Sequence, residues 1–376
     1  MQHWHIITGG YPPQPGGVSD YTRQVAVELA RAGDVVNIWA PACGMADPID
    51  PGVAVHRLPG HFGPRAIAIL DRQLRMNPAR ILVQYVPHAF GFKAMNFPFV
   101  SWLYARRRAN ISVMFHEVAY PVDSSQSLKH NLLGVATRKM AAIVARAAGR
   151  IFVSTSSWES QLRALSGTAK PIVSIPVPSN LPVVEDCLAI QAIRQRHWPV
   201  EGPIVGHFGT YGDSIAKLLD RIFPAILAEV PHASAFLIGR NSEVFREKLI
   251  ARNPQLGGRI AATGTLAERD ASAHISACDL MLQPYPDGIS TRRTTAMVAL
   301  AHGRALATTS GHLTESLWAE SGAVAISPVN EPLENVSLAV GLLLDATHRK
   351  QLGAAGRALY RSKFDISNTV AALRAA

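Results

Sequence analysis

Strand-like and helix-like segments alternate along almost the whole chain of 376 residues. Short apolar runs such as 80–85 and 112–115 predict buried strands, and longer segments such as 19–32 and 126–146 predict helices. This alternation is typical of α/β folds, in which helices cover both faces of a parallel sheet. The sequence therefore predicts an α/β protein, and its length suggests about two domains.

Proline residues and a more polar composition mark the region around residues 177–202. We therefore predict a Rossmann-like N-terminal domain at 1–180, a linker at 181–202 and a second Rossmann-like domain at 203–355. A C-terminal helix within 356–376 is predicted to cross back to the first domain. Ligands of doubly wound sheets bind beyond the C-terminal ends of the strands, so the loops at those ends are the candidate sites.

The formal charge is unevenly distributed along the sequence. Residues 1–180 hold 18 Lys and Arg against 9 Asp and Glu, whereas the remainder holds 19 against 18. A basic half favours anionic partners, either phosphorylated substrates or anionic lipid headgroups. Nucleic acid is disfavoured, because no aromatic-rich RNA-binding signature and no zinc finger accompany the basic residues.

The sequence predicts a cytoplasmic protein. Its three cysteines are widely spaced, and it shows neither a signal-peptide pattern nor a long apolar run. A further hypothesis is peripheral contact with the inner face of an anionic membrane. Its candidate patch consists of Trp102, Leu103, Tyr104 and the arginines 106–108. The alternative is that the apolar members belong to the core and the arginines are solvated.

The stretch from Cys278 to Thr309 combines a buried strand, a polar loop, a helix of small residues and a second strand. Free N–H groups at a helix N-terminus favour anions, and arginine adds a planar fork of donors suited to phosphate. The loop therefore predicts a phosphate-bearing ligand. The alternative is an ordinary turn with solvated arginines, since the spacing matches no standard phosphate-binding motif. The candidate residues are Asp287, Gly288, Ser290, Arg292, Arg293 and Thr294.

Two glycine-rich loops open the two halves in similar ways. Gly16 and Gly17 precede the first predicted helix, and Gly209 and Thr210 follow the first strand of the second half. Glycine permits close backbone approach to a ligand, and Lys217 just beyond adds a cation. The alternative is that the glycines only form ordinary turns and that Lys217 is a solvated helix residue.

Two further polar residues lie at the ends of predicted strands. His116 suits hydrogen bonding to sugar hydroxyls or proton movement, although a lone histidine is more often structural. The carboxylate of Glu315 could accept hydrogen bonds from ribose or sugar hydroxyls. The alternative is that Glu315 only caps the helix that follows it. No metal-binding motif and no paired-aspartate motif is visible, so we predict neither a metal nor a cofactor.

Taken in order, these segments resemble the family-4 (GT4) retaining glycosyltransferases of GT-B fold. The segments that carry the resemblance are Gly16-Gly17-Val18, Phe115-His116-Glu117, 148–156, 205–209, 277–284, 299–309 and Glu315. The resemblance implies two Rossmann-like doubly wound domains facing a central cleft. It also implies that His116 contacts the donor sugar, Asp287 and Gly288 lie over its hydroxyls, and Glu315 holds the ribose.

The sequence departs from the family pattern at the charged positions. The family carries two glutamates in an EX7E motif, but here Asp287 stands at the first position and Met297 or Val298 at the second. His207 stands at the family's arginine position. We therefore expect Arg292 or Arg293 to bind the diphosphate of the donor, with Lys217 as the second candidate.

The predicted function is transfer of a sugar from a nucleotide-diphosphate sugar to an acceptor hydroxyl, without metal, in the synthesis of a polysaccharide, another glycan or a glycoconjugate. The expected acceptor is a glycan, a lipid-linked molecule or a small molecule. A sugar-nucleotide epimerase and a non-catalytic glycosyltransferase-like subunit are the alternatives.

Overall fold

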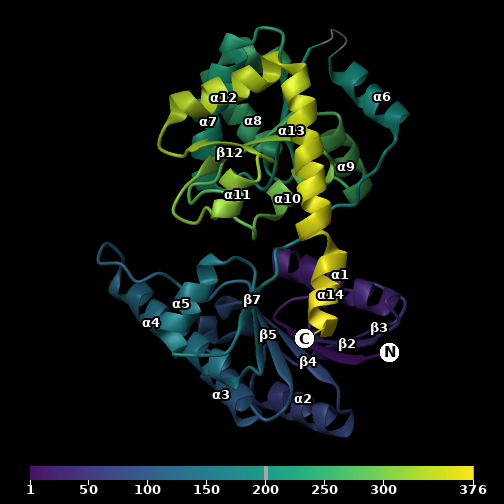
Figure 1. The fold of residues 1–376 in the computed structure, drawn as a ribbon, viewed down its shortest axis with the longest axis vertical. Coiled ribbons are helices and arrows are strands. Elements are labelled where there is room, and N and C mark those ends of the chain that lie inside the picture. The colour runs from purple at the N-terminus through teal and green to yellow at the C-terminus, as the bar shows by residue number, and fades with distance from the viewer. Residues whose placement is uncertain (199–201, 376) are drawn as a thin grey trace. The chain divides into compact units, whose positions relative to one another are not determined.

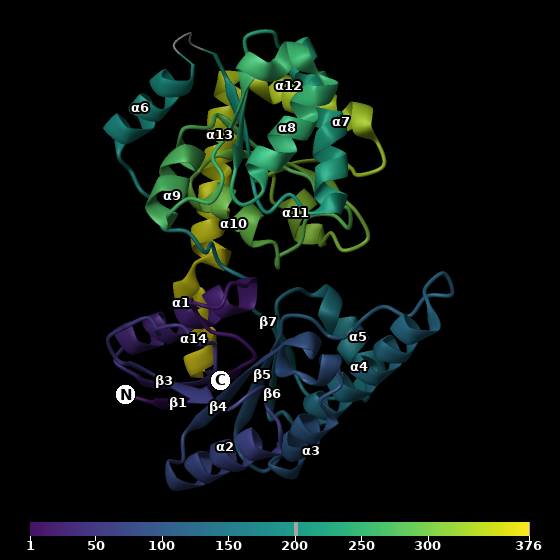
Figure 2. The same cartoon turned by 180° about the vertical axis from the view of Figure 1, so that it is seen from behind.

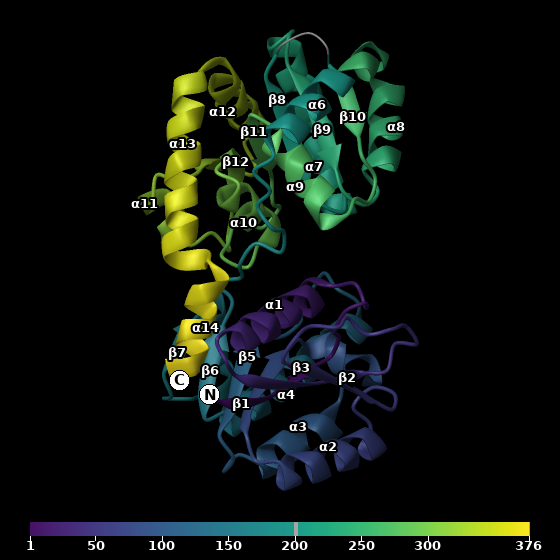
Figure 3. The same cartoon turned by 90° about the vertical axis from the view of Figure 1, so that its right-hand side faces the viewer.

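A computed structural model describes residues 1–198 and 202–375. The chain divides into two compact units. Unit 1 comprises Met1–Val177 together with Ile366–Ala376, and unit 2 comprises Pro178–Asp365. Figures 1–3 show the elements of each unit.

Among the described residues, unit 1 forms a parallel sheet of seven strands in the order β3-β2-β1-β4-β5-β6-β7. The register pairs Ile6 with Ile38 on one side and with Leu82 on the other. Central parallel strands are buried on both faces, which explains their apolar sequences. The strands are β1 (His3–Thr8), β2 (Val35–Pro41), β3 (Val53–Leu58), β4 (Arg80–Tyr85), β5 (Ile111–Phe115), β6 (Arg150–Val153) and β7 (Ile172–Ser174).

Two hydrophobic clusters cover the faces of this sheet. Helices α2, α3, α4 and α5 pack against one face, and α1 and α14 against the other, as Figure 3 shows for α1 and α14. The helices are α1 (Gly17–Arg31), α2 (Pro64–Met76), α3 (Phe97–Ala105), α4 (Leu128–Ala147), α5 (Ser157–Ser166) and α14 (Ile366–Ala375), with short turns η1 (Pro87–Phe90) and η2 (Phe92–Ala94). The C-terminal helix α14 is held to the rest of unit 1 by an ion pair between Arg374 and Asp34 (3.3 Å).

The described part of unit 2 forms a parallel sheet of six strands in the order β10-β9-β8-β11-β12-β13. Side chains of one strand alternate between the two faces, so Leu280 and Leu282 enter one cluster and Met281 enters the other. The strands are β8 (Ile204–Phe208), β9 (Ser234–Ile238), β10 (Ile260–Ala262), β11 (Leu280–Gln283), β12 (Ala305–Ser310) and β13 (Ala325–Pro328).

Helices α7, α8 and α12 cover one face of this sheet, and α9, α10 and α11 cover the other. Helix α13 packs beside β12 and α10. The helices are α6 (Cys187–His197), α7 (Asp213–Glu229), α8 (Ser242–Arg252), α9 (Glu268–Ser276), α10 (Thr294–Ala301), α11 (Ser316–Glu320), α12 (Pro332–Leu344) and α13 (Ala346–Leu359), with η3 (Pro254–Arg259) and the π-turn η4 (Tyr360–Phe364).

The expected α/β class with two doubly wound sheets is confirmed. The linker expected at 181–202, of which 199–201 lie outside the described residues, is instead part of unit 2. Arg194 of α6 donates to Ala277 O (2.8 Å) and pairs with Asp279 (3.0 Å), which ties this segment to the strand β11 region. None of the described helices is long and apolar enough to cross a membrane.

The surface patch expected on α3 is instead part of the packing of unit 1. Leu103 is fully buried, and Trp102 Nε1 and Arg106 both bind Asp71, so these side chains serve the packing of α2 against α3. The interpretation of Leu103 as part of an exposed surface is therefore wrong.

The strand order determines where loops of each unit come together. In unit 1 the chain reverses its direction of winding between β1 and β4, and in unit 2 between β8 and β11. Loops that follow neighbouring strands diverge at these switch points and leave room for a ligand. The candidate residues of unit 2 lie in the loops after β8, β11 and β12, apart from Lys217 in α7 and Thr294 at the start of α10.

Candidate functional site

The loop between β11 and α10, residues 284–293, is fastened to strand β12. Tyr285 N donates to Thr309 Oγ1 (2.7 Å), and Ile289 N donates to Thr309 O (2.8 Å). Gly288 has a φ of 88°, in the left-handed region that glycine adopts without strain. These bonds fix the loop backbone and therefore the directions in which its side chains leave it.

Asp287 brings the two neighbouring arginines of this loop together. Its Oδ2 accepts from Arg292 Nη2 (2.7 Å), and its Oδ1 accepts from Arg293 Nη2. The Arg293 guanidinium also lies 4.6 Å from the centre of the Tyr285 ring, a cation–π distance. Thr294, the first residue of α10, follows directly. The structure therefore gathers three of the candidate side chains at the start of α10, with Asp287 orienting both arginines.

Glu315 holds the same loop from the other side. Its Oε1 accepts from Thr291 Oγ1 (2.6 Å), and its Oε2 accepts from Thr291 N (2.8 Å) and from Trp318 Nε1 (2.9 Å). Glu315 precedes α11 but makes no side-chain capping bond, so the alternative that it merely caps that helix is wrong. Ser290 is buried between these anchors, and its Oγ has no hydrogen-bond partner within residues 1–198 and 202–375.

The loop after β8 contains Gly209 and Thr210, and Thr210 and Lys217 are exposed. His207, two residues before Gly209, is buried, and its Nδ1–H donates to Leu282 O (2.8 Å). Nε2 is therefore the unprotonated nitrogen, and it lacks a partner among the described residues. Burial lowers the pKa of His207 to about 4, so this side chain supplies no positive charge at neutral pH.

In unit 1, His116 follows β5 and is buried against its neighbours. Its Nε2–H donates to Gln84 Oε1 at the end of β4 (2.8 Å), and its ring meets the edge of Tyr21 at 4.8 Å. Burial lowers the pKa of His116 to about 3. The neutral ring therefore offers Nδ1 as a hydrogen-bond acceptor, which suits a hydroxyl rather than a phosphate.

The glycines before α1 present open backbone. Gly16 is the N-cap residue of α1 and Gly17 its first residue, and both are exposed. A Cβ added at Gly17 would meet no atom within 4 Å. The first N–H groups of α1 are therefore accessible to a ligand from solvent.

Three buried histidines make folding stability depend on pH. The pKa values of His116, His207 and His302 are lowered by burial to about 3, 4 and 4, whereas an unfolded histidine titrates near 6.5. Their neutral state is fully compatible with folding above pH 6.5, and stability is lost as the pH falls toward 4, because the unfolded chain binds more protons. We expect the free energy of unfolding to fall by on the order of 2 kcal/mol or more per histidine, measured by urea titration. The assignment would be contradicted if the free energy of unfolding of the wild type did not change between pH 7 and pH 4.5 and that of His302→Gln showed the same pH dependence.

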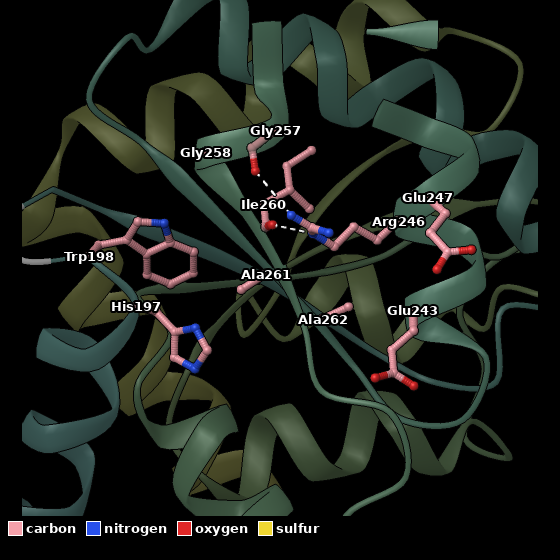
Figure 4. Close-up of a pocket in the computed structure, with 10 residues that line it drawn as sticks. All are labelled: His197, Trp198, Glu243, Arg246, Glu247, Gly257, Gly258, Ile260, Ala261 and Ala262. Atoms are coloured by element: carbon pink, nitrogen blue, oxygen red, sulfur yellow. Dashed lines mark hydrogen bonds between the residues drawn. The ribbon is translucent and has the colours of Figure 1, made fainter. Parts of the chain in front are cut away.

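A cavity of about 430 Å³ lies elsewhere in unit 2, along the edge strand β10. Figure 4 shows Trp198 and His197 on one side, and Glu243 and Glu247 of α8 on the other. Arg246 crosses it and donates to the carbonyl oxygens of Ile260 (2.6 Å) and Gly257 (3.1 Å). In the sheet order β9 and β8 separate β10 from β11, so this cavity is distinct from the β11–α10 loop.

Sequence reasoning missed two glutamines that lie beside the candidate residues. Gln84 ends the apolar part of β4 and binds His116, and Gln283 ends β11 and donates to Phe208 O (3.1 Å). Each keeps one amide atom without a partner in the described part of the chain. A glutamine closing an otherwise apolar strand is the signal that would have found both.

Residues 16–178 match the family model described as a glycosyl transferase 4-like domain. The N-terminal part of the chain therefore contains a glycosyl transferase 4-like domain. The chain is 24% identical over 346 residues to the phosphatidyl-myo-inositol mannosyltransferase of Mycolicibacterium smegmatis, which covers 88% of this chain and 82% of that protein. No groups of three or more His, Cys, Asp or Glu suited to a metal ion occur among its described residues.

Solved structures confirm the GT-B fold of the chain. Sucrose-phosphate synthase from Thermosynechococcus elongatus superimposes with a TM-score of 0.77 at 18% identity, over 100% of this chain and 98% of that one. HepE of Anabaena, in complex with UDP and glucose, gives a TM-score of 0.69 at 16% identity, with the same coverage. At these identities the likeness concerns the fold.

Proposed function

We propose that this protein is a glycosyltransferase that moves a sugar from a nucleotide-diphosphate sugar to an acceptor hydroxyl, with retention and without a metal. The observation that carries this proposal is the arginine pair that Asp287 orients at the start of α10. A structural neighbour adds support for the donor class, since Anabaena HepE has been solved in complex with UDP-glucose.

The chemistry of the leaving group explains why such a pair is useful. Cleavage of the bond between sugar and diphosphate places negative charge on the diphosphate, which oriented donors stabilise more in the transition state than in the ground state. Asp287 accepts from one nitrogen of each guanidinium, and each guanidinium has five N–H donors. In this proposal Arg292 and Arg293 stabilise the diphosphate, and Asp287 is a positioning residue.

Other residues of unit 2 complete the proposed donor site. In this proposal Thr294 N, at the start of α10, contacts the phosphates, and Lys217 adds an exposed cation. Gly209 N and Gly288 N already donate to Ile238 O (3.0 Å) and Tyr285 O (3.0 Å), so these two glycines contribute only by letting the backbone approach the ligand closely. The buried Ser290 hydroxyl is available for a sugar or ribose hydroxyl. Glu315 keeps the loop in place through Thr291.

For unit 1 we propose binding of the acceptor near Gly16 and Gly17 at the start of α1. His116 assists the reaction as a neutral acceptor of a hydrogen bond from a hydroxyl, consistent with its depressed pKa. The acceptor class is a glycan, a lipid-linked molecule or a small molecule. The reaction would serve the synthesis of a glycan or glycoconjugate.

The donor is identified by thermal shift with UDP, GDP and their sugars, because a ligand of the folded state raises Tm with concentration. We expect one nucleotide to bind equally well with and without EDTA. Arg292→Ala and Arg293→Ala should each weaken its binding about tenfold, the loss of a charge-assisted hydrogen bond. Arg252→Ala is the matched control, since that exposed arginine pairs with Asp220 on the surface of the same unit.

Unchanged nucleotide affinity in both loop variants, or binding that disappears with EDTA, would refute the proposed donor site. Retention is tested separately, by determining the anomeric configuration of the product by NMR. A product with inverted anomeric configuration would contradict the proposed retention but would not affect the proposed donor site.

A further inference from the structure

The cavity beside the edge strand β10 has the size of a small-molecule site. Its volume of about 430 Å³ lies in the range of roughly 300–1,000 Å³ that is typical of ligand pockets. Its wall combines an indole ring, two carboxylates, a guanidinium and the backbone of β10, and no residue of the loop 284–293 takes part in it. The cavity is therefore a place in unit 2 where a ligand can bind apart from the proposed donor site.

Trp198 is held in position at the α6 side of the cavity (Figure 4). Its backbone N–H donates to Arg194 O (2.9 Å), and its partly buried ring packs against Phe236 with ring centres 4.5 Å apart and an angle of 68° between the planes. The indole Nε1–H has no hydrogen-bond partner within residues 1–198 and 202–375. The side chain therefore offers the cavity both an aromatic surface and a free donor.

The opposite side of the cavity is acidic. Glu243 and Glu247 are four positions apart on α8, so both carboxylates leave the same face of the helix. Both side chains are exposed, and neither forms an ion pair with any residue that the structure describes. Arg246 between them turns to the sheet and uses Nε and Nη2 for the carbonyl oxygens of Ile260 and Gly257, which leaves Nη1 as a donor.

The backbone of β10 adds further polar groups. β10 is the last strand on its side of the described sheet, so one of its edges has no strand partner there. Thr263 N donates inward to Leu237 O, and the groups of alternate residues point the other way, so Ala262 presents its N–H and C=O to the cavity. Arg246 already occupies Ile260 O, which prevents a strand of another chain from pairing along this edge. The free groups of Ala262 therefore suit a small ligand.

The charges of the lining side chains favour a neutral ligand. Glu243 and Glu247 outnumber the single guanidinium of Arg246, and burial lowers the pKa of His197, which is therefore neutral at neutral pH. The excess of negative charge disfavours a nucleotide or a sugar phosphate, and the guanidinium disfavours an organic cation.

Among neutral ligands a saccharide matches this lining. A hydroxyl group both donates and accepts, and the cavity offers carboxylate acceptors together with indole, guanidinium and backbone donors. The C–H groups on one face of a sugar ring carry partial positive charge and pack on the negative face of an indole.

We propose that the β10 cavity is a second binding site of unit 2 and binds a neutral saccharide. Trp198 packs on the sugar ring, Glu243 and Glu247 accept hydrogen bonds from its hydroxyls, and Ala262 N–H donates to it. The site holds a glycan on the surface of unit 2 and takes no part in bond formation. The proposal does not depend on the proposed transfer reaction, because saccharide binding is measured without nucleotide and without turnover.

The test is a titration of the full chain with glucose, mannose and galactose and with their 6-phosphates, followed by saturation-transfer NMR. We expect at least one neutral sugar to bind at millimolar concentration, and its 6-phosphate to bind more weakly because the carboxylates repel it. Trp198→Ala should weaken binding of the neutral sugar about tenfold. Glu243→Gln with Glu247→Gln should weaken it about fivefold, the difference between a charged and a neutral acceptor, and leave the Tm unchanged because both side chains are exposed.

Two exposed residues elsewhere provide matched controls. Tyr104→Ala removes an aromatic ring that is 40% exposed on α3 of unit 1, and Glu334→Gln removes an exposed carboxylate on α12 of unit 2. Both variants should bind the sugar as the wild type does. Arg292→Ala with Arg293→Ala should also keep saccharide binding, and Trp198→Ala should keep nucleotide affinity, which separates this proposal from the proposed donor site.

Four results overturn the proposal: no binding of any of the three neutral sugars, wild-type affinity in Trp198→Ala, wild-type affinity in the double glutamine variant, or an equal loss of binding in the two controls. Tighter binding of the 6-phosphate, lost in Trp198→Ala, would overturn it too and assign the cavity to an anionic ligand.

Discussion

Replacing Gly288 with alanine is expected to reduce transfer activity at least about 100-fold, the loss that follows when a reacting group is displaced by roughly 1 Å. The φ of 88° at this position is strained for alanine, and its Cβ would overlap Thr314 Oγ1 and Gly311 N. Neither neighbour moves easily, because Gly311 N belongs to the backbone and donates to Thr314 Oγ1 (3.0 Å). The loop that holds Asp287 must shift as a result.

The matched control for this change is Gly322→Ala in the same unit. Gly322 has a φ of 60°, but a Cβ there meets open space. We expect a loss of roughly 1 kcal/mol of stability from the left-handed backbone and full activity. Steady-state kinetics and thermal unfolding of both variants separate the two effects. Wild-type kcat/KM in Gly288→Ala would show that the position of this loop does not matter for the reaction.

Asp287→Asn is expected to lower kcat/KM for the donor about 100-fold, equivalent to roughly 3 kcal/mol. The carboxylate accepts from both Arg292 and Arg293, and its two oxygens serve one guanidinium each. Asparagine keeps the size but offers one acceptor oxygen and no charge, so the two cations repel each other and lose their orientation. Donor affinity and turnover should both decrease, because Arg292 and Arg293 are proposed to hold the diphosphate.

Asp220→Asn provides the comparison. Asp220 pairs with the exposed Arg252, and such surface pairs contribute little. Its kinetics should match the wild type. If Asp287→Asn also kept the wild-type kcat/KM while its arginines remained essential, Asp287 would not be the residue that positions them.

The sequence by itself allowed the fold class and much of the β11–α10 loop to be predicted. Alternating apolar and amphipathic segments are a local property, and they define parallel sheets covered by helices. The candidate residues Asp287, Arg292 and Arg293 are within six positions of each other, so any turn keeps them close. That Asp287 binds both arginines was not predicted, because a turn permits several side-chain arrangements.

Contacts between distant residues were decided by tertiary structure alone. Gln84 reaches His116 because β4 and β5 are neighbours in the sheet, and periodicity does not reveal strand order. Glu315 reaches Thr291 because the loops after β11 and β12 leave the same edge of the sheet. The cavity beside β10 also depends on packing, since it lies between the end of α6 and the helix α8, which are distant in the sequence.

The sequence thus determined which elements form and which residue types follow the strands, since both depend on local patterns of hydrophobicity and charge. Tertiary structure decided which of those residues meet, which charges are paired and which apolar side chains stay in contact with solvent. The physical reason is that strand order and side-chain packing bring together residues that are far apart in the chain, and a local sequence pattern does not predict such contacts.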